Sequence, residues 1–151
     1  MGRPAHFFDL GGTLLALDGR DEIAWADGRV TVLPGVRQRL AALAGTPVFV
    51  VTNQSGIAEG DLTAERFDAY CAQLSAATGG AVTAYAVCAH RRDAGCGCRK
   101  PAPGLVLDLA AAHDVDLPGS ILVGDSNADQ RLAAAAGIGR FDWADRYFGR
   151  A

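Results

Sequence analysis

The sequence lacks the features that mark membrane and exported proteins. It has no uninterrupted apolar run of the ~18 to 20 residues that a membrane-spanning helix needs. The residues before Phe7 contain neither the apolar segment nor the small-residue cleavage site of a secretory signal peptide. We therefore expect a soluble chain that works in the cytoplasm and has no membrane partner.

Aromatic residues and lysine are also scarce. Aromatic residues make up 7% of the chain although 50% of it is hydrophobic, so alanine, valine and leucine must form most of the core. Lys100 is the only lysine, and the net charge of −3 gives no bulk attraction for nucleic acid. The 151 residues show no repeat and no shift in composition, which predicts one domain over residues 1–151. No long apolar or heptad stripe is left over, so we expect a monomer.

Short apolar runs alternate with segments of helical spacing. Buried strands are predicted at 5–8, 48–51, 82–87 and 121–123 because these runs are short and apolar. Helices are predicted at 34–44, 63–78, 103–113 and 127–136, with Thr63 as an N-cap and with Gly45, Gly79 and Gly137 at helix ends. The tail 141–148 is expected to add a last strand or edge. This order predicts an α/β fold with a doubly wound, Rossmann-like parallel sheet and helices on both faces.

Three polar side chains directly follow predicted strands. Asp9, Thr52 and Asp125 should converge, because ligands of parallel sheets bind at the carboxyl ends of the strands. Each acid taken alone is equally well a helix cap or a turn residue. Two carboxylates in one crevice repel each other unless a cation lies between them, and Mg²⁺ prefers such oxygen ligands. An aspartate in such a site can attack phosphorus and form an aspartyl-phosphate.

Four segments resemble the motifs of the haloacid dehalogenase superfamily, and within it the capless branch of histidinol-phosphate and heptose-bisphosphate phosphatases. They lie in the expected order at residues 9–13 (DLGGT), 50–58 (VVTNQSGIA), 98–101 (CRKP) and 123–129 (VGDSNAD). The resemblance implies that Asp9 is the nucleophile and binds catalytic Mg²⁺ together with the Gly11 carbonyl and Asp125. The residues that it assigns to the phosphoryl group or the substrate are Thr52, Asn53, Arg99 and Lys100. Asp129 either supports the metal site or is only an acid on a helix face.

Three of the four cysteines and one histidine crowd into residues 88–98. The set is Cys88, His90, Cys96 and Cys98. Three thiolates and one imidazole form a closed ligand set typical of structural zinc, and the spacing favours a metal over disulfides in a cytoplasmic chain. The other interpretation is three buried free cysteines and one surface histidine. We expect Zn²⁺ to fix the loop that continues into Arg99 and Lys100, and we expect Cys71 to pack as a core residue.

Position 11 departs from the resemblance. Phosphatases of this superfamily carry a second aspartate there, which protonates the leaving group and later activates water, whereas this chain has Gly11. General acid–base assistance is typically worth ~10² to 10⁴ in rate. The chain is therefore a slower phosphatase, an enzyme with a different leaving-group chemistry, or a non-catalytic binding protein. We favour the first interpretation because the other motif elements are retained, and because the chain has neither the length for a cap domain nor a second lysine for phosphonate cleavage.

The substrate is less sharply defined. The polar segment 18–32 could cover the crevice from one side, and its charged residues Asp18, Asp21, Glu22 and Arg29 either touch a sugar or an amine or are solvated. The resemblance implies a small phosphorylated metabolite. The first candidate is a sugar phosphate such as heptose 1,7-bisphosphate, and the second is histidinol phosphate.

Overall fold

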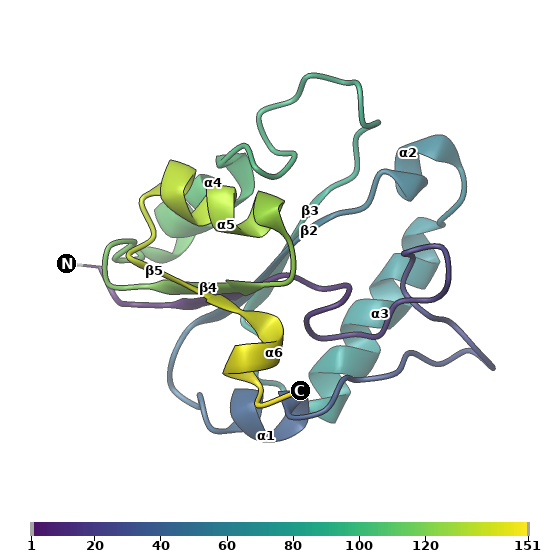
Figure 1. Cartoon of the computed structure of the whole chain (residues 1–151), viewed down its shortest axis with the longest axis horizontal. Helices are drawn as coiled ribbons and strands as arrows, with labels where there is room; N and C mark the ends of the chain where they lie inside the picture. Colours follow the sequence, from purple (N-terminus) through teal and green to yellow (C-terminus); the bar gives the residue numbers. More distant parts are fainter. Residues whose placement is uncertain (1, 151) are drawn as a thin grey trace.

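The computed structural model describes residues 2–150 and contains a five-stranded parallel sheet (Figure 1). The strand order is β3-β2-β1-β4-β5, and each neighbouring pair is parallel. The strands are β1 (His6–Phe8), β2 (Val48–Asn53), β3 (Ala84–Cys88), β4 (Ile121–Gly124) and β5 (Arg140–Trp143). The helices are α1 (Val36–Ala41), α2 (Gly56–Glu59), α3 (Ala64–Ala77), α4 (Gly104–His113), α5 (Asn127–Ala136) and α6 (Ala144–Tyr147). The predicted doubly wound α/β fold is confirmed.

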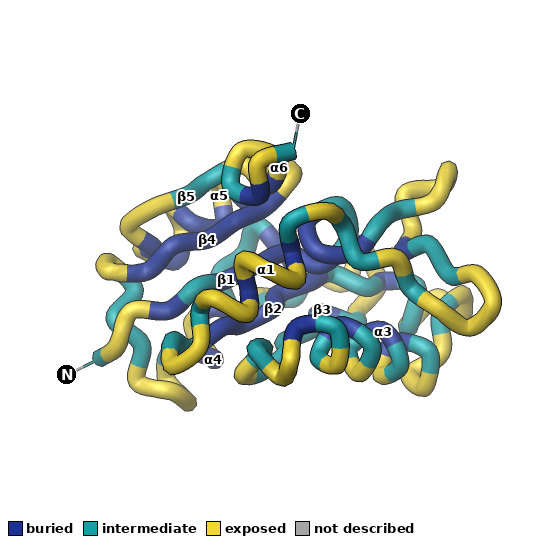
Figure 2. Tube along the Cα trace, turned by 90° about the horizontal axis from the view of Figure 1, so that it is seen from below, coloured by how far each residue is buried: buried dark blue, intermediate teal, exposed yellow. Residues whose placement is uncertain are grey.

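Helices cover both faces of the sheet because successive strand residues point to opposite sides. Phe8 and Val50 are fully buried on the face that is packed by α1, α3 and α6. Phe7 and Phe49 are fully buried on the other face, under α4 and α5. Figure 2 shows the resulting pattern, with buried central strands and helices whose outer sides are exposed. Burial on both faces explains why the strands have continuous apolar sequences.

The predicted helix at 34–44 is too long. The chain enters α1 through Gly35, whose φ of 84° lies in the left-handed region, so Pro34 is outside the helix. A side chain at Gly35 would meet the Phe148 carbonyl oxygen at 2.7 Å, which shows how closely the C-terminal segment approaches here. The helix ends at Ala41, and Gly45 follows in a separate turn.

The remaining elements follow the predictions closely, with two additions. Thr63 caps α3, since its side chain accepts a hydrogen bond from the Arg66 N–H, and α5 has the predicted bounds. The short helix α2 was not predicted, and the tail forms the edge strand β5 followed by α6. Among the described residues, none of the helices combines the length and apolarity needed to cross a membrane.

Candidate active site

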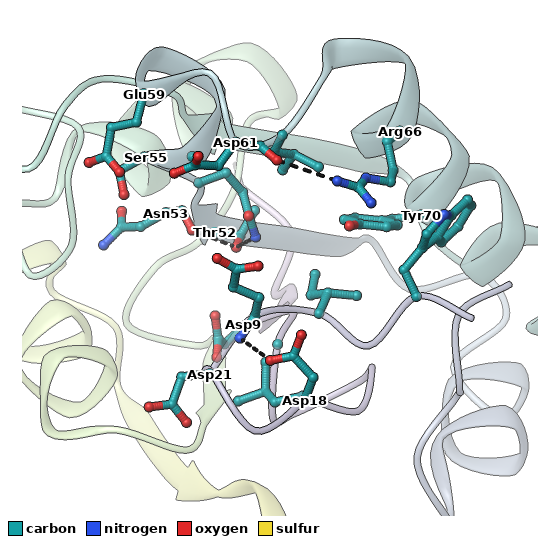
Figure 3. A pocket seen from close by; sticks show the side chains of 18 of the residues that line it. Asp9, Asp18, Asp21, Thr52, Asn53, Ser55, Glu59, Asp61, Arg66 and Tyr70 are labelled. Atoms are coloured by element: carbon teal, nitrogen blue, oxygen red, sulfur yellow. Dashed lines mark hydrogen bonds between the residues drawn. The ribbon is translucent and has the colours of Figure 1, made fainter. Parts of the chain in front are cut away.

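A cavity of about 400 Å³ opens where β1, β2 and β4 end (Figure 3). Asp9 and Gly11 line it from the turn after β1, Thr52 from the last part of β2, and Asp125 from the turn after β4. The predicted convergence of Asp9, Thr52 and Asp125 is therefore found. It follows from the parallel topology, which brings three strand ends to one edge of the sheet.

The walls of the cavity come from the loop after β1 and from helix α3. Asp18, Asp21 and Glu22 line it from the loop, as the sequence suggested, whereas Arg29 lines a separate groove against α3. On the facing wall, Tyr70 is packed edge-on against Trp25, with ring centroids 5.4 Å apart. The cavity therefore has acidic and aromatic surfaces beyond its strand-end floor.

The only lysine is buried between two carboxylates. Lys100 Nζ donates hydrogen bonds to Asp9 Oδ1 at 2.7 Å, to Asp129 Oδ1 at 2.8 Å and to the Val51 carbonyl oxygen at 3.1 Å. Burial opposes the charge, but the adjacent Asp9 and Asp129 outweigh it and raise the pKa of Lys100. Lys100 is thus an ammonium ion that orients Asp9 from behind, and it is not among the residues that line the cavity.

Asp129 joins the lysine to the backbone of the β4–α5 turn. Its Oδ2 accepts hydrogen bonds from the N–H groups of Asp125 at 3.1 Å and Ser126 at 3.3 Å, and the Ser126 hydroxyl caps the Asp129 N–H in return. This reciprocal capping box begins α5. Asp129 is 1% exposed, so it is not a solvated acid on the outer face of the helix.

The acids of the site fit a divalent cation. Carboxylate oxygens of Asp9, Asp125 and Asp129 lie within 4.8 Å of one another, and one lysine faces all this negative charge. Desolvation, followed by the proximity of Asp9 and Asp129, raises the pKa of Asp125 to about 7. A carboxyl group that takes up a proton near neutral pH indicates uncompensated negative charge, which a Mg²⁺ ion bound to oxygen ligands would balance.

The two glycines after Asp9 have different surroundings. Gly12 has a φ of 80°, and a Cβ there would collide with Asp125 Oδ2, so only glycine fits. At Gly11 a Cβ would meet Leu17 Cδ2 at 2.7 Å and Ile23 Cγ1 at 3.6 Å. The space beside Gly11 is thus filled by two flexible hydrocarbon side chains.

Of two further residues assigned by the resemblance, Asn53 lines the cavity beside Thr52 and Arg99 does not. Asn53 pairs with the main chain of Lys100, accepting from its N–H at 3.0 Å and donating to its carbonyl oxygen at 3.4 Å. The Asn53 amide therefore joins the end of β2 to the loop that carries the lysine. Arg99 is not among the residues lining the cavity, and its Nη1 is buried with no hydrogen-bond partner in the described part of the chain.

The predicted zinc ligands meet in one cluster. Ligand atoms of all four side chains, Cys88, His90, Cys96 and Cys98, lie within 4.8 Å of one another. Cys98 Sγ is 3.0 Å from Cys88 Sγ and 3.1 Å from His90 Nδ1. The three thiols and the imidazole are the donor set of a structural zinc site, so the residues present fit the ion. Cys71 lies apart on α3 and packs against the core, as expected.

Sequence reasoning missed the residues that close the cavity from α2 and α3. Arg66 and Tyr70 are one helical turn apart on α3 and line the same wall. Their spacing of four residues could have indicated, from the sequence, that both side chains lie on one face of a helix. Arg92 from the loop after β3 lies 4.0 Å from Glu59 of α2 at the same cavity, and no local pattern connects these two residues.

The order of the sheet, the acids at its strand ends and the buried lysine define a haloacid dehalogenase-type fold and site. A sequence model of the polynucleotide kinase 3 phosphatase family matches residues 5–151. The chain belongs to this family.

Two curated relatives carry the same name, D-glycero-beta-D-manno-heptose-1,7-bisphosphate 7-phosphatase. The one from Bordetella bronchiseptica is 44% identical over 110 residues, which cover 70% of this chain and 62% of the relative. The one from Pseudomonas aeruginosa is 39% identical over 140 residues, covering 89% and 78%. This chain thus spans about three fifths of the first relative and more than three quarters of the second.

Solved structures of other proteins share this fold. The D,D-heptose 1,7-bisphosphate phosphatase of B. bronchiseptica, complexed with magnesium and phosphate, superposes with a TM-score of 0.81 at 35% identity. The superposition covers 91% of this chain and 78% of that one. A haloacid dehalogenase-superfamily hydrolase from Geobacter sulfurreducens shares the fold, with a TM-score of 0.58 at 16% identity over 93% of this chain and 95% of that one.

Proposed function

We propose that this chain is a Mg²⁺-dependent phosphatase that hydrolyses a small phosphorylated metabolite through an aspartyl-phosphate on Asp9. The observation that carries the proposal is the Asp9 carboxylate, held by buried Lys100 where three strands end in a cavity. A carboxylate that is oriented by a lysine and faces a space of this size is suited to nucleophilic attack on phosphorus. Family membership and the named phosphatases among the relatives support the same chemistry.

The metal ligands in this proposal are Asp9, the Gly11 carbonyl and Asp125. When bound there, Mg²⁺ supplies positive charge to the transferring phosphoryl group. Asp129 contributes by fixing the Asp125 backbone and Lys100. The magnesium and phosphate complex of the B. bronchiseptica relative supports this assignment.

The chain's own groups then have separate tasks. Asp9 attacks phosphorus, and Lys100 orients it through the 2.7 Å ion pair. Thr52, buried at the cavity floor, offers its hydroxyl to a phosphoryl oxygen. Asn53 lines the cavity beside Thr52 and is assigned to the phosphoryl group, and it also holds the Lys100 main chain. Arg99 is kept as a substrate-binding residue on the resemblance, and its Nη1, buried without a partner among the described residues, would have to become accessible to reach a substrate. A structural Zn²⁺ on the cluster of Cys88, His90, Cys96 and Cys98 holds the same loop.

The first substrate candidate is heptose 1,7-bisphosphate, which the names of the relatives from B. bronchiseptica and P. aeruginosa support. The packed rings of Trp25 and Tyr70 offer an apolar surface of the kind on which a sugar ring can lie. Histidinol phosphate is the second candidate. A non-catalytic binding protein is the alternative from another class, and the observation that favours it is Gly11 in place of the acid.

A phosphate-release assay tests the proposal. Wild-type chain and Asp9→Asn are incubated with Mg²⁺ and, in turn, heptose 1,7-bisphosphate, histidinol phosphate and 4-nitrophenyl phosphate. We expect release by the wild type from at least one of these and none by the variant, which lacks the nucleophilic carboxylate. Absence of release from every compound, with fold and zinc content intact, contradicts the phosphatase and favours the binding protein.

A further inference from the structure

The wall beside Asp9 is hydrocarbon at the place where a side chain of residue 11 would project. Leu17 Cδ2 and Ile23 Cγ1 are the atoms nearest to a Cβ built on Gly11. Leu17 and Ile23 are partners in an antiparallel bridge, and Ile23 is buried. The missing side chain is therefore replaced by an apolar surface that cannot exchange a proton.

The polar groups around the nucleophile are already engaged. Thr13 Oγ1 donates a hydrogen bond to Asp9 Oδ2 at 3.4 Å, and Asp125 is committed to Mg²⁺ as a carboxylate ligand in the proposed site. Lys100 Nζ donates hydrogen bonds to Asp9 at 2.7 Å and to Asp129 at 2.8 Å, so its protons are held by these two carboxylates. Asp18, on the loop that carries Leu17, accepts hydrogen bonds from the N–H groups of Arg20 at 2.7 Å and Glu22 at 3.2 Å. The carboxylate of Asp18 therefore stabilises its own loop as an acceptor. None of these contacts offers a proton to a group leaving from phosphorus.

We propose that this site selects its substrates by the basicity of the leaving oxygen. It transfers phosphoryl groups rapidly only from acyl phosphates, phosphoanhydrides and aryl or enol phosphates, and slowly from alkyl phosphates. The inference rests on the proposed function, because it describes which substrates the same Asp9 site uses. It also makes an alkyl ester such as the heptose 7-phosphate a slow substrate of this chain.

The chemical step balances without a protein acid. An Asp9 oxygen forms a bond to phosphorus while the bond from phosphorus to the leaving oxygen breaks, and that oxygen departs with the electron pair. The departing anion takes a proton from water only afterwards. A carboxylate (conjugate acid near pKa ~4) or a phenolate (~10) leaves as an anion far more readily than an alkoxide, which is a much stronger base. In the second step water attacks phosphorus, releases inorganic phosphate and restores the Asp9 carboxylate.

A series of substituted phenyl phosphates tests the inference with little change in substrate shape. The quantity to measure is kcat/KM, because it reports the steps up to phosphoryl transfer to Asp9 whatever the rate of later hydrolysis. We expect kcat/KM to fall steeply as the pKa of the leaving phenol rises. Acetyl phosphate should be a good substrate, and a simple alkyl phosphate should be slower than 4-nitrophenyl phosphate by ~10² to 10⁴, the usual worth of a general acid.

Two variants at one position isolate the cause. Gly11→Asp supplies a proton donor and should raise the ratio of kcat/KM for the alkyl phosphate to kcat/KM for 4-nitrophenyl phosphate by ~10². Gly11→Asn has nearly the same size but no acidic proton, so it should keep the steep wild-type dependence. Adding Leu17→Ala to both variants removes the atom that a new Cβ would meet at 2.7 Å, in case crowding prevents folding.

The outcomes separate this inference from the proposed function. Similar kcat/KM values across the phenyl series and the alkyl phosphate in the wild type overturn the inference and leave the phosphatase standing. A folded Gly11→Asp chain as steeply dependent on the leaving group as Gly11→Asn also overturns it. No phosphate release from any compound, acetyl phosphate included, overturns the proposed function itself.

Discussion

Lys100 balances Asp9 and Asp129 in a space that water barely reaches. Its pKa is raised above the ordinary 10.5, so the ammonium is charged throughout the neutral range. Its contribution to stability is therefore present at neutral pH and would be lost only as pH rises through the raised pKa. The position of Lys100 explains why this chain, whose other basic residues are arginines, has a lysine here: a compact ammonium fits between two carboxylates.

The first prediction concerns removal of this charge. Lys100→Met leaves Asp9, Asp125 and Asp129 facing one another, and breaking a buried pair typically costs ~3 to 5 kcal/mol. We expect a loss of that order in the free energy of unfolding without metal, measured by urea denaturation, together with loss of phosphate release. Arg131→Met removes an exposed cation from α5 and is the control. Equal stability of the two variants would show that the buried charges are not coupled.

A second prediction follows from the pKa of Asp125, which is raised to about 7 in the metal-free chain. Between its ordinary value of 3.8 and about 7, the folded chain holds a proton that the unfolded chain has released. Metal-free stability should therefore fall as pH rises through this window. Mg²⁺ must displace that proton, so its stabilising effect should be small near the lower end of the window and full above it.

Thermal unfolding with and without Mg²⁺ across this pH range measures the effect. Asp125→Asn, which cannot titrate, should show neither the pH dependence nor the metal effect. A stabilisation by Mg²⁺ that is the same at both ends of the window would contradict the assignment of Asp125 as a ligand.

At the scale of elements, the central strands and the longer helices could be predicted from sequence because their signals are local. Val48–Asn53 is a continuous apolar run, and α5 begins at a serine cap and ends at Gly137. The start of α1 could not be predicted, because Gly35 before it is in the left-handed region and is approached by Phe148 from the far end of the chain. The four-residue helix α2 is too short for a periodic signal.

The residues of the site likewise include some that could be predicted from sequence and some that could not. The strand-end residues Asp9, Thr52 and Asp125 could be predicted because parallel topology alone brings them together. The cavity walls could not, since the contact between Trp25 and Tyr70 depends on how the loop after β1 folds over α3. Likewise, only the folded structure shows that the Asn53 side chain accepts a hydrogen bond from the Lys100 N–H.

The third prediction belongs to the loop between β3 and α4, which Figure 1 shows extending from the body of the molecule. The purified chain should contain about one zinc per molecule, because the cluster is a closed four-ligand set. Cys98→Ser should lower zinc content, thermal stability and phosphate release together, since Arg99 and Lys100 follow directly. Elemental analysis and thermal unfolding provide the measurements.

Cys71→Ser is the matched control, because Cys71 is a partly buried thiol outside the cluster. It should keep the zinc. Zinc-free wild-type chain with an unchanged melting temperature would contradict the structural role of the metal.

For the whole molecule, the balance of charge around the cavity has a consequence for binding. Seven acids and two arginines are among its lining residues, while Lys100 lies behind Asp9. A phosphate dianion entering this field without a cation would be repelled. The fourth prediction is that inorganic phosphate binds measurably by calorimetry only when Mg²⁺ is present. Equal affinity with and without Mg²⁺ would mean that the cavity binds phosphate by other means.

The central claim is that Asp9 accepts a phosphoryl group. The most direct measurement is intact-mass spectrometry after rapid acid quenching of the chain mixed with acetyl phosphate and Mg²⁺. Because no acid–base group stands at Gly11 to activate water, the aspartyl-phosphate should persist long enough to be trapped. We expect an adduct of one phosphoryl group that maps to Asp9 and is absent from Asp9→Asn. A folded, zinc-containing wild-type chain that shows neither this adduct nor phosphate release would contradict the account.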